Sequence, residues 1–222
     1  MIWQKFTLGL LRRYHAHRLK KNPSPLAQLL WQCWQSAAAS DHGQLLAVDL
    51  EMSALTTHEG EIVAAGWVAI DGQNIRFGSA EHHLVSANNS VGDSATIHHL
   101  RDCDLAAGGD SESMVAALLR AANGRTLLFH NASLDLAFLN QLCRQLCGVP
   151  LLLPHRDTLL IEKRRLEASN QILKANSLTL FQCRQRYHLP DFAGHNALAD
   201  ALATAELYLA QNAYRRGRNS RH

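Results

Sequence analysis

The sequence predicts an α/β fold, with a mixed five-stranded sheet flanked by helices and an N-terminal helical extension. Three observations favour this fold class. Two strand-like runs joined by Asp71–Gly72 indicate an antiparallel hairpin. Beyond residue 110, helical and strand-like segments alternate, as they do in α/β domains. The length of 222 residues and the hydrophobic content of 47% suit one globular domain with a proper core.

Residues 1–42 are expected to form a basic helical extension. Within residues 2–21, apolar side chains recur at spacings of three and four: Trp3, Phe6, Leu10 and Tyr14. We expect this stripe to pack on the body of the protein or on a partner. Proline-containing residues 22–25 then interrupt the helix, and Ser24 is expected to cap a second one. The first segment is a poor signal peptide, because it lacks an uninterrupted apolar centre.

The main domain is expected over residues 43–214, followed by a basic tail at 215–222. Strands are predicted at 44–52, 61–70, 74–84, 125–130 and 151–157. Helices are predicted at 111–122, 134–146, 158–168, 177–187 and 196–215. Short helix and loop are expected at 91–108.

Charge is distributed unevenly along the chain. Residues 1–40 contain six Lys or Arg and no acid, and residues 215–222 contain four Arg and no acid. All nineteen acidic residues therefore lie between these ends, in a body that carries net negative charge. Such a body repels a phosphate chain, whereas the basic ends could attract one or another anionic partner. The alternative is that the two basic ends are tails that only increase solubility, which would give the same distribution of charge.

The cysteines and the hydropathy indicate the cellular compartment in which the protein is expected. The five cysteines are odd in number and form no CxxC pair, which favours reduced thiols in a cytoplasmic protein. Cys143 and Cys147 are expected to pack as small apolar residues. No apolar run approaches the roughly 20 residues that cross a bilayer.

Two carboxylates interrupt the apolar run LLAVDLEMSAL at residues 45–55. In a strand, Val48, Leu50 and Met52 share one face, whereas Asp49 and Glu51 share the other. Neighbouring like charges repel, so this pair requires a cation or water. Their Cα atoms would lie about 7 Å apart, which lets the side chains converge on one Mg²⁺ or Mn²⁺ ion. A solvated strand face is the alternative.

Two further motifs place polar groups beside apolar elements. In HNASLD, a buried strand ends at His130 and Asp135 lies in the helix that follows. This carboxylate could simply interact with the helix dipole. In GHNALAD, His195 lies in the entry loop of the last helix and Asp200 lies inside that helix. An Asp within an Ala-rich helix has few structural explanations, since Asp is a poor helix former and a poor core residue.

Together, the DxE pair, the HNASLD segment and the HxxxxD motif resemble the DEDDh (DnaQ-like) 3′–5′ exonucleases, a proofreading-type family with an RNase H-like fold. The resemblance covers about residues 44–212. It implies two Mg²⁺ ions, with Mn²⁺ as a possible substitute, and a general base, His195. The ligands that it implies are Asp49, Glu51, Asp135 and Asp200. A histidine can accept the proton of an attacking water near neutral pH.

The resemblance also implies contacts to the 3′-terminal nucleotide. The residues at the corresponding positions are Met52, Ser53, Leu55, His130 and Asn131. The family usually has Thr-Thr-Gly after its first motif, whereas this chain has Met-Ser-Ala, which leaves the substrate class open.

The expected function is hydrolysis of single-stranded DNA from its 3′ end, with release of nucleoside 5′-monophosphates. One alternative is an exoribonuclease of the same family. The other is a nuclease-fold module that binds or bridges a polymerase or repair complex. A protein partner could also contact the N-terminal helices, and the oligomeric state is left open.

Several other residues invite a functional interpretation. The basic run 163–165 could contact phosphates, although an ordinary solvated helix face is favoured. Asp157 could orient a neighbouring group, although a cap for the next helix is favoured. His82–His83 and His98–His99 lack a Cys at ligand spacing and are not expected to bind zinc.

Overall fold

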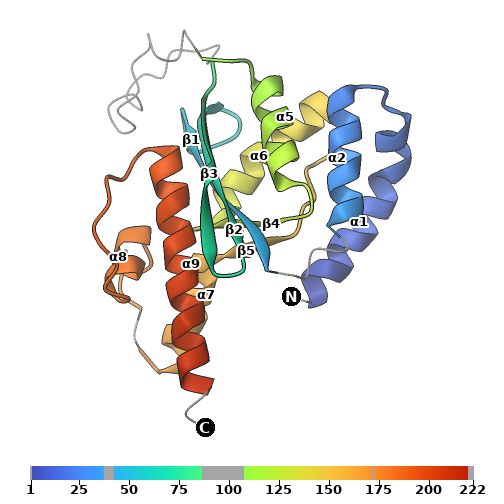
Figure 1. Ribbon diagram of the computed structural model, residues 1–222. Coiled ribbons are helices and arrows are strands. Elements are labelled where there is room, and N and C mark those ends of the chain that lie inside the picture. The colour runs from blue at the N-terminus through green and yellow to red at the C-terminus, as the bar shows by residue number, and fades with distance from the viewer. Residues whose placement is uncertain (1, 38–42, 87–107, 172, 220–222) are drawn as a thin grey trace.

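The computed structural model describes residues 2–37, 43–86, 108–171 and 173–219. A mixed sheet with strand order β3-β2-β1-β4-β5 runs through the middle of the molecule (Figure 1). Its strands are β1 (Gln44–Met52), β2 (Ile62–Asp71), β3 (Asn74–Leu84), β4 (Thr126–Phe129) and β5 (His155–Asp157). The first three strands pair antiparallel, whereas β4 runs parallel to both β1 and β5. The predicted five-stranded mixed sheet is confirmed.

Helices cover both faces of the sheet. They are α1 (Ile2–Lys21), α2 (Pro25–Ser36), α5 (Ser111–Ala122), α6 (Ala132–Cys147), α7 (Thr158–Ala168), α8 (Leu180–Gln185) and α9 (Ala197–Asn219). In Figure 1, α1, α2, α5 and α6 lie on one side of the sheet, and α9 lies on the other with α7 and α8. Among the described residues, no helix has both the length and the apolar character needed to cross a membrane.

Strand β1 sends alternate side chains into two cores. Leu46, Val48 and Leu50 belong to the larger core, which also contains residues of α2, α5 and α6. Leu45 and Ala47 belong to a smaller core beneath α9. The next two residues on the α9 side are Asp49 and Glu51. The predicted alternation is confirmed, and it delivers both carboxylates to the face that α9 covers.

The N-terminal extension is built into the larger core. Ser24 caps α2, as predicted, by accepting a hydrogen bond from the backbone N–H of Ala27. Buried side chains of α2 join those of α5 and α6. The Trp34 indole N–H donates to the Leu151 carbonyl at 2.7 Å. These contacts tie the extension to the segment that leads into β5.

Two members of the stripe predicted on α1 do not pack on the body of the protein, and packing of the stripe on a partner stays a prediction. Leu10 is 51% exposed and Tyr14 is 78% exposed, while the side chains of Trp3 and Phe6 lie outside the described part of the chain. The body contacts the opposite side of the helix, where Leu19 is buried. Arg12 donates two hydrogen bonds to the Leu152 carbonyl, at 2.9 and 2.7 Å. A guanidinium group that satisfies a loop carbonyl therefore orients α1.

Three element boundaries differ from prediction by more than two residues. Strand β5 covers residues 155–157 rather than 151–157, because Leu152 adopts a left-handed conformation with φ of 48°. Helix α8 begins at Leu180 rather than 177, where the Thr179 hydroxyl accepts from the Gln182 N–H. Helix α9 continues to Asn219 and so includes most of the predicted basic tail. The segment predicted at 91–108 falls outside the described residues apart from its last residue.

Candidate metal centre

Three carboxylates from two elements meet at the end of β1. Asp49 and Glu51 come from the strand, and Asp200 comes from the first turn of α9. One ligand oxygen from each lies within 4.8 Å of the other two. Burial of three acids so close together is costly without a positive charge between them. Carboxylate oxygens are the ligands that hard divalent cations prefer, so this donor set fits such an ion.

Asp135 lies beside this group. It belongs to the first turn of α6 and is only 7% exposed. Burial raises the pKa of Asp135, and the backbone of Leu50, the residue between Asp49 and Glu51, is one of the groups that lower it. The three oxygens within 4.8 Å do not include one from Asp135. The structure therefore brings all four predicted ligands together, with Asp135 as the outlying member, and their role as ligands stays a prediction.

Gly66 explains how α9 reaches the strand. Asp49 pairs with Gly66 across the β1–β2 ladder. A Cβ atom on Gly66 would lie 2.2 Å from the Leu198 backbone nitrogen and 2.4 Å from the Ala197 carbonyl carbon. The first turn of α9 thus contacts the main chain of β2 at a residue that has no side chain. This contact brings Asp200 close to Asp49. Sequence analysis missed Gly66, although a glycine inside an apolar strand is a signal for close backbone approach.

The entry loop of α9 holds Asp200 through its backbone. The His195 N–H donates to Asp200 Oδ2 at 2.9 Å. Asn196 Oδ1 accepts from the Ala199 N–H at 3.1 Å and caps the helix. His195 itself is exposed and left-handed, with φ of 66°. The loop therefore orients the carboxylate with a main-chain donor and leaves the imidazole at the surface beside the acidic group.

Asp157 joins two helix N-termini. Its carboxylate accepts from the Leu159 N–H at 2.9 Å and so caps α7, as predicted. The same carboxylate accepts from the N–H groups of Asn131 and Ala132, both at 3.0 Å, at the start of α6. Asn131 makes no capping bond through its own side chain. Asp157 therefore also fixes the helix that carries Asp135, a role for which the sequence offers only a weak signal.

The residues predicted to contact substrate lie in different settings. Met52 ends β1 and is half-buried, and Ser53 is held by reciprocal hydrogen bonds with the Glu61 backbone at 3.0 Å. Leu55 is 82% exposed. Asn131 is exposed and left-handed, with φ of 68°. Their contact with substrate stays a prediction.

His130 is engaged inside the protein. Its Nδ1 lies 2.8 Å from the Thr158 hydroxyl, and its Nε2 lies 2.9 Å from the Leu178 carbonyl. Burial lowers the pKa of His130. Both ring nitrogens thus have partners within the protein. His130 could therefore contact a substrate only through its backbone or the face of its ring.

The structure bears differently on the remaining interpretations of the sequence. Arg165 is not part of a solvated helix face, since it pairs with the buried carboxylate of Glu162 at 2.7 Å. His83 stacks on Trp67, with ring centroids 4.6 Å apart, whereas His98–His99 lies outside the described residues. Cys143 and Cys147 are buried, as predicted.

Burial and mutual repulsion raise the pKa values of the acidic group. Burial raises the pKa of Asp49 well above its usual range, and Asp135, Asp200 and Glu51 add to the effect. Burial and then Asp200 raise the pKa of Glu51 to about 7. Burial also raises the pKa of Asp135 to about 7, against the backbone donors that lower it. The group therefore favours protons, or other cations, at neutral pH.

We expect the metal-free protein to lose stability as pH rises from about 5 to about 8. For Glu51 and Asp135 the folded-state pKa, about 7, exceeds the unfolded value. Their contribution is therefore complete below the unfolded pKa and is lost as pH rises through the folded one, a change on the order of a few kcal/mol. Thermal unfolding in EDTA across this range measures the loss.

Two additions sharpen that measurement. Mn²⁺ should restore stability most at the alkaline end of the range, where the carboxylates are free to bind it. Glu51→Gln should flatten the pH dependence in EDTA. Metal-free protein whose stability increases between pH 5 and pH 8 would contradict this account of the acidic group.

Replacing Asp157 by Ala should lower both the stability of the protein and the exonuclease activity that the sequence predicts. The loss of two helix caps costs roughly 2 kcal/mol. Because one of them fixes the helix that carries Asp135, we also expect activity to fall by about 10- to 100-fold. Asp110→Ala is the matched control, since Asp110 caps α5 through the Ser113 N–H at 2.7 Å, on an element that carries none of the four acids. Chemical denaturation and initial rates separate the two effects, and equal activity in both variants would refute the positioning role.

A family model described as an exonuclease, RNase T, matches residues 46–208. Among curated proteins, the chain is 26% identical over 171 residues to a PolC-type DNA polymerase III of Thermotoga petrophila. That match covers 76% of this chain and 12% of the polymerase. The corresponding protein of Thermotoga maritima is 26% identical over 165 residues, covering 74% of this chain and 11% of that protein. The chain thus corresponds to a small part of these relatives.

Solved structures share the fold. The cell-death related nuclease CRN-4 aligns with a TM-score of 0.65 at 14% identity, covering 78% of this chain and 64% of that one. Exonuclease I of E. coli in complex with a dT13 oligonucleotide aligns with a TM-score of 0.61 at 15% identity, covering 75% and 40%. A full-length 3′-exonuclease aligns with a TM-score of 0.64 at 13% identity, covering 78% and 82%. The predicted RNase H-like fold is confirmed.

Proposed function

Because the chain belongs to the RNase T exonuclease family, we propose that it is a 3′–5′ exonuclease that degrades single-stranded DNA by a two-metal mechanism. The family match bears out the resemblance to the DEDD exonucleases and makes the chain a nuclease, a hydrolase of phosphodiester bonds. One observation carries the rest of the proposal: Asp49, Glu51 and Asp200 gather their ligand oxygens within 4.8 Å. The raised pKa of each of these acids supports a site for divalent cations.

Different side chains of the protein would perform different parts of the reaction. When bound, two Mg²⁺ ions, or Mn²⁺ in their place, would activate a water and stabilise the leaving 3′ oxygen. Asp49, Glu51, Asp135 and Asp200 would hold them. The His195 imidazole would accept the proton of the water as it attacks the last phosphodiester. Cleavage between phosphorus and the 3′ oxygen would then release a nucleoside 5′-monophosphate.

The substrate is proposed from the surroundings of the acidic group. Leu55 presents an apolar side chain at the surface, 82% exposed, just beyond the end of β1. Such a side chain suits contact with the face of any base, and therefore binding without sequence preference. The fold neighbour exonuclease I forms a complex with a dT13 oligonucleotide. We extend binding of such a DNA oligonucleotide to this chain.

A degradation assay tests substrate and polarity together. DNA and RNA oligonucleotides of one sequence, labelled at the 5′ end, are incubated with Mg²⁺, with Mn²⁺ or with EDTA. We expect DNA to shorten stepwise from its 3′ end only when metal is present. Faster shortening of RNA would favour the exoribonuclease alternative. Intact oligonucleotides in every lane would favour the binding module.

His195→Ala should slow the reaction and leave metal binding in place. Loss of a general base lowers kcat by roughly 10²- to 10⁴-fold. Asp200 would keep its hydrogen bond, because the donor is the backbone N–H of residue 195. Single-turnover rates and Mn²⁺ titration check both parts, with His188→Ala as a control at another exposed, left-handed loop histidine. A kcat equal to that of the unmodified protein would exclude His195 as the base.

Two further expectations concern the setting of the enzyme. The described cysteines are buried and free, which suits a reducing compartment, and we place the protein in the cytoplasm. Helix α1 exposes Leu10, Leu11 and Tyr14. This surface would suit a protein partner of the exonuclease.

A further inference from the structure

A pocket of about 800 Å³ lies between α7 and the second half of α9. None of the four acids of the candidate metal centre lines it. Its first residue on α9, Tyr208, is eight positions beyond Asp200, or roughly 12 Å along the helix axis. The lining is rich in two residue types: the arginines Arg156, Arg164, Arg165 and Arg215, and the tyrosines Tyr187, Tyr208 and Tyr214.

The pocket is strongly positive. Four arginines line it, against one carboxylate, that of Asp157. That carboxylate already accepts backbone N–H groups from two helices. Within the described part of the chain, neither Arg156 nor Arg164 has a carboxylate within ion-pair distance. Two cationic groups of the lining thus have no anionic partner among the residues that the structure describes.

Aromatic rings lie among these charges. The Arg156 guanidinium lies 5.7 Å from the Tyr208 ring centroid and hydrogen-bonds to its hydroxyl. Tyr187 and Tyr214 meet edge to face, with centroids 5.9 Å apart. Tyr214 is 46% exposed, so part of its ring remains open to the solvent. Rings beside guanidinium groups are the combination with which proteins hold single nucleotides of a strand.

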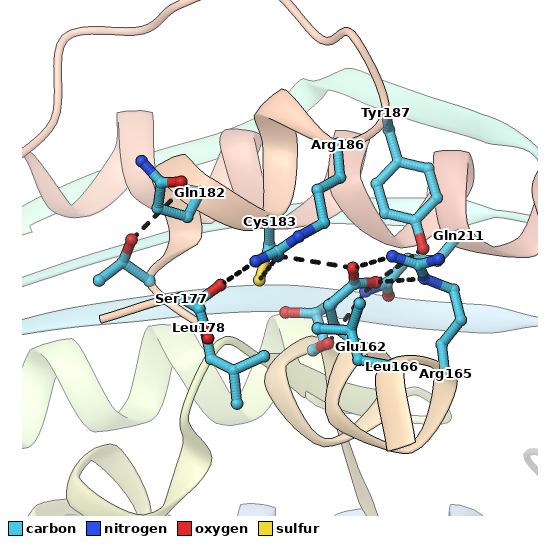
Figure 2. A network of polar contacts seen from close by, with 12 residues as sticks. Glu162, Arg165, Leu166, Ser177, Leu178, Gln182, Cys183, Arg186, Tyr187 and Gln211 are labelled. Carbon is cyan, nitrogen blue, oxygen red and sulfur yellow. Dashed lines mark hydrogen bonds and ion pairs between the residues drawn. The ribbon is translucent and has the colours of Figure 1, made fainter. Parts of the chain in front are cut away.

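A buried carboxylate keeps one wall of the pocket in place. Figure 2 shows Glu162 between Arg165, Arg186 and Tyr187. Arg165 donates to both of its oxygens, at 2.7 and 3.2 Å, and the Tyr187 hydroxyl donates at 2.7 Å. Arg186 lies 3.6 Å away. Two arginines on one carboxylate leave a net positive charge at this wall of the pocket, and their hydrogen bonds and ion pairs hold the wall in place without a ligand.

We propose that this pocket binds a nucleotide, with the base against Tyr214 and the phosphate on Arg156, Arg164 and Arg215. The volume lies within the range of small-ligand sites. The ligand is either a free nucleotide or one nucleotide unit of a longer strand, since both offer the same base and phosphate. This site is separate from the proposed exonuclease centre, and its existence does not depend on catalysis.

Binding of labelled DNA to the full chain in EDTA tests the proposal. The probe is a fluorescent thymidine hexanucleotide, followed by anisotropy, with dTMP and an abasic hexamer as competitors. We expect Arg164→Glu combined with Arg215→Glu to weaken binding at least roughly tenfold and to lower its salt dependence. Tyr214→Ala should weaken it to a similar degree. Arg13→Glu and Arg120→Glu, exposed changes on α1 and α5, are the matched controls and should bind normally.

Each outcome has a defined meaning. Competition by dTMP identifies a free nucleotide as ligand, whereas competition by the intact hexamer alone identifies a unit of a strand. An abasic hexamer that competes as well as the intact one would overturn the proposal, because charge alone would then explain binding. Normal binding by both pocket variants would also overturn it. Binding is measured in EDTA and activity is measured with Mg²⁺. A protein that binds the probe in EDTA but stays inactive with Mg²⁺ would refute the proposed catalysis and leave the pocket standing.

Discussion

Asp200→Asn is expected to abolish nearly all exonuclease activity while leaving the protein folded. Asp200 contributes one of the three oxygens that lie within 4.8 Å. An amide in its place removes one negative charge from the proposed metal site. Bound divalent ions would supply several kcal/mol of transition-state stabilisation, so their loss or displacement should cost about 10³-fold or more in rate. The substitution is nearly isosteric, and the side-chain oxygen can still accept from the His195 N–H.

The measurement is the rate of 3′ shortening of a labelled oligonucleotide at saturating Mg²⁺. Thermal unfolding in EDTA should show a protein at least as stable as the unmodified one, because repulsion within the acidic group is relieved. Glu167→Gln is the control, since Glu167 is an exposed partner of Lys163 at 3.9 Å. A variant at position 200 that retains a tenth or more of the activity would exclude Asp200 as a ligand.

Gly66→Ala should distort the candidate metal centre, although Gly66 is not one of its four acids. The added methyl group would lie 2.2 Å from the Leu198 nitrogen, so β2 and α9 must separate. Overpacking of this kind costs roughly 1–3 kcal/mol. Separation also carries Asp200 away from Asp49, and a displacement near 1 Å can lower a rate by about 10²-fold. A single methyl group, on a residue outside the acidic group, would thus lower the rate by about 10²-fold.

Gly78→Ala is the matched control for that change. Gly78 lies on β3, and a Cβ there would meet nothing within 4 Å. We expect normal activity from this variant and a stability close to that of the unmodified protein. The two variants are compared by denaturant unfolding and by Mn²⁺ affinity. Full activity with normal Mn²⁺ affinity in Gly66→Ala would show that the contact between α9 and the strand does not set the position of Asp200.

Local signals predicted most of the sheet and much of the site. The alternation in β1 places Asp49 and Glu51 on the face opposite Leu50, because strand side chains alternate strictly. Asp71–Gly72 predicts the turn into β3, where Gly72 adopts a φ of 63°. These features depend on neighbours in sequence, which is why the sequence reveals them.

Contacts between distant segments escaped prediction for a physical reason. Arg12 orients α1 by donating to Leu152, 140 positions away, so the apolar stripe did not predict which side of that helix contacts the body. Asp157 fixes the start of α6 from β5. Gly66 matters only because α9 lies against it. Each depends on which elements the fold brings together, and a local sequence pattern gives at most a weak signal of that.

Uptake of Mn²⁺ tests the central claim most directly. Titration of the full chain, followed by calorimetry and by the spin-resonance signal of free Mn²⁺, should show saturable binding in the unmodified protein. Binding should be greatly weakened in Asp49→Asn and unchanged in Glu167→Gln. An unmodified protein that takes up no Mn²⁺, or an Asp49→Asn variant that binds it as tightly, would contradict the metal centre on which the proposed mechanism depends.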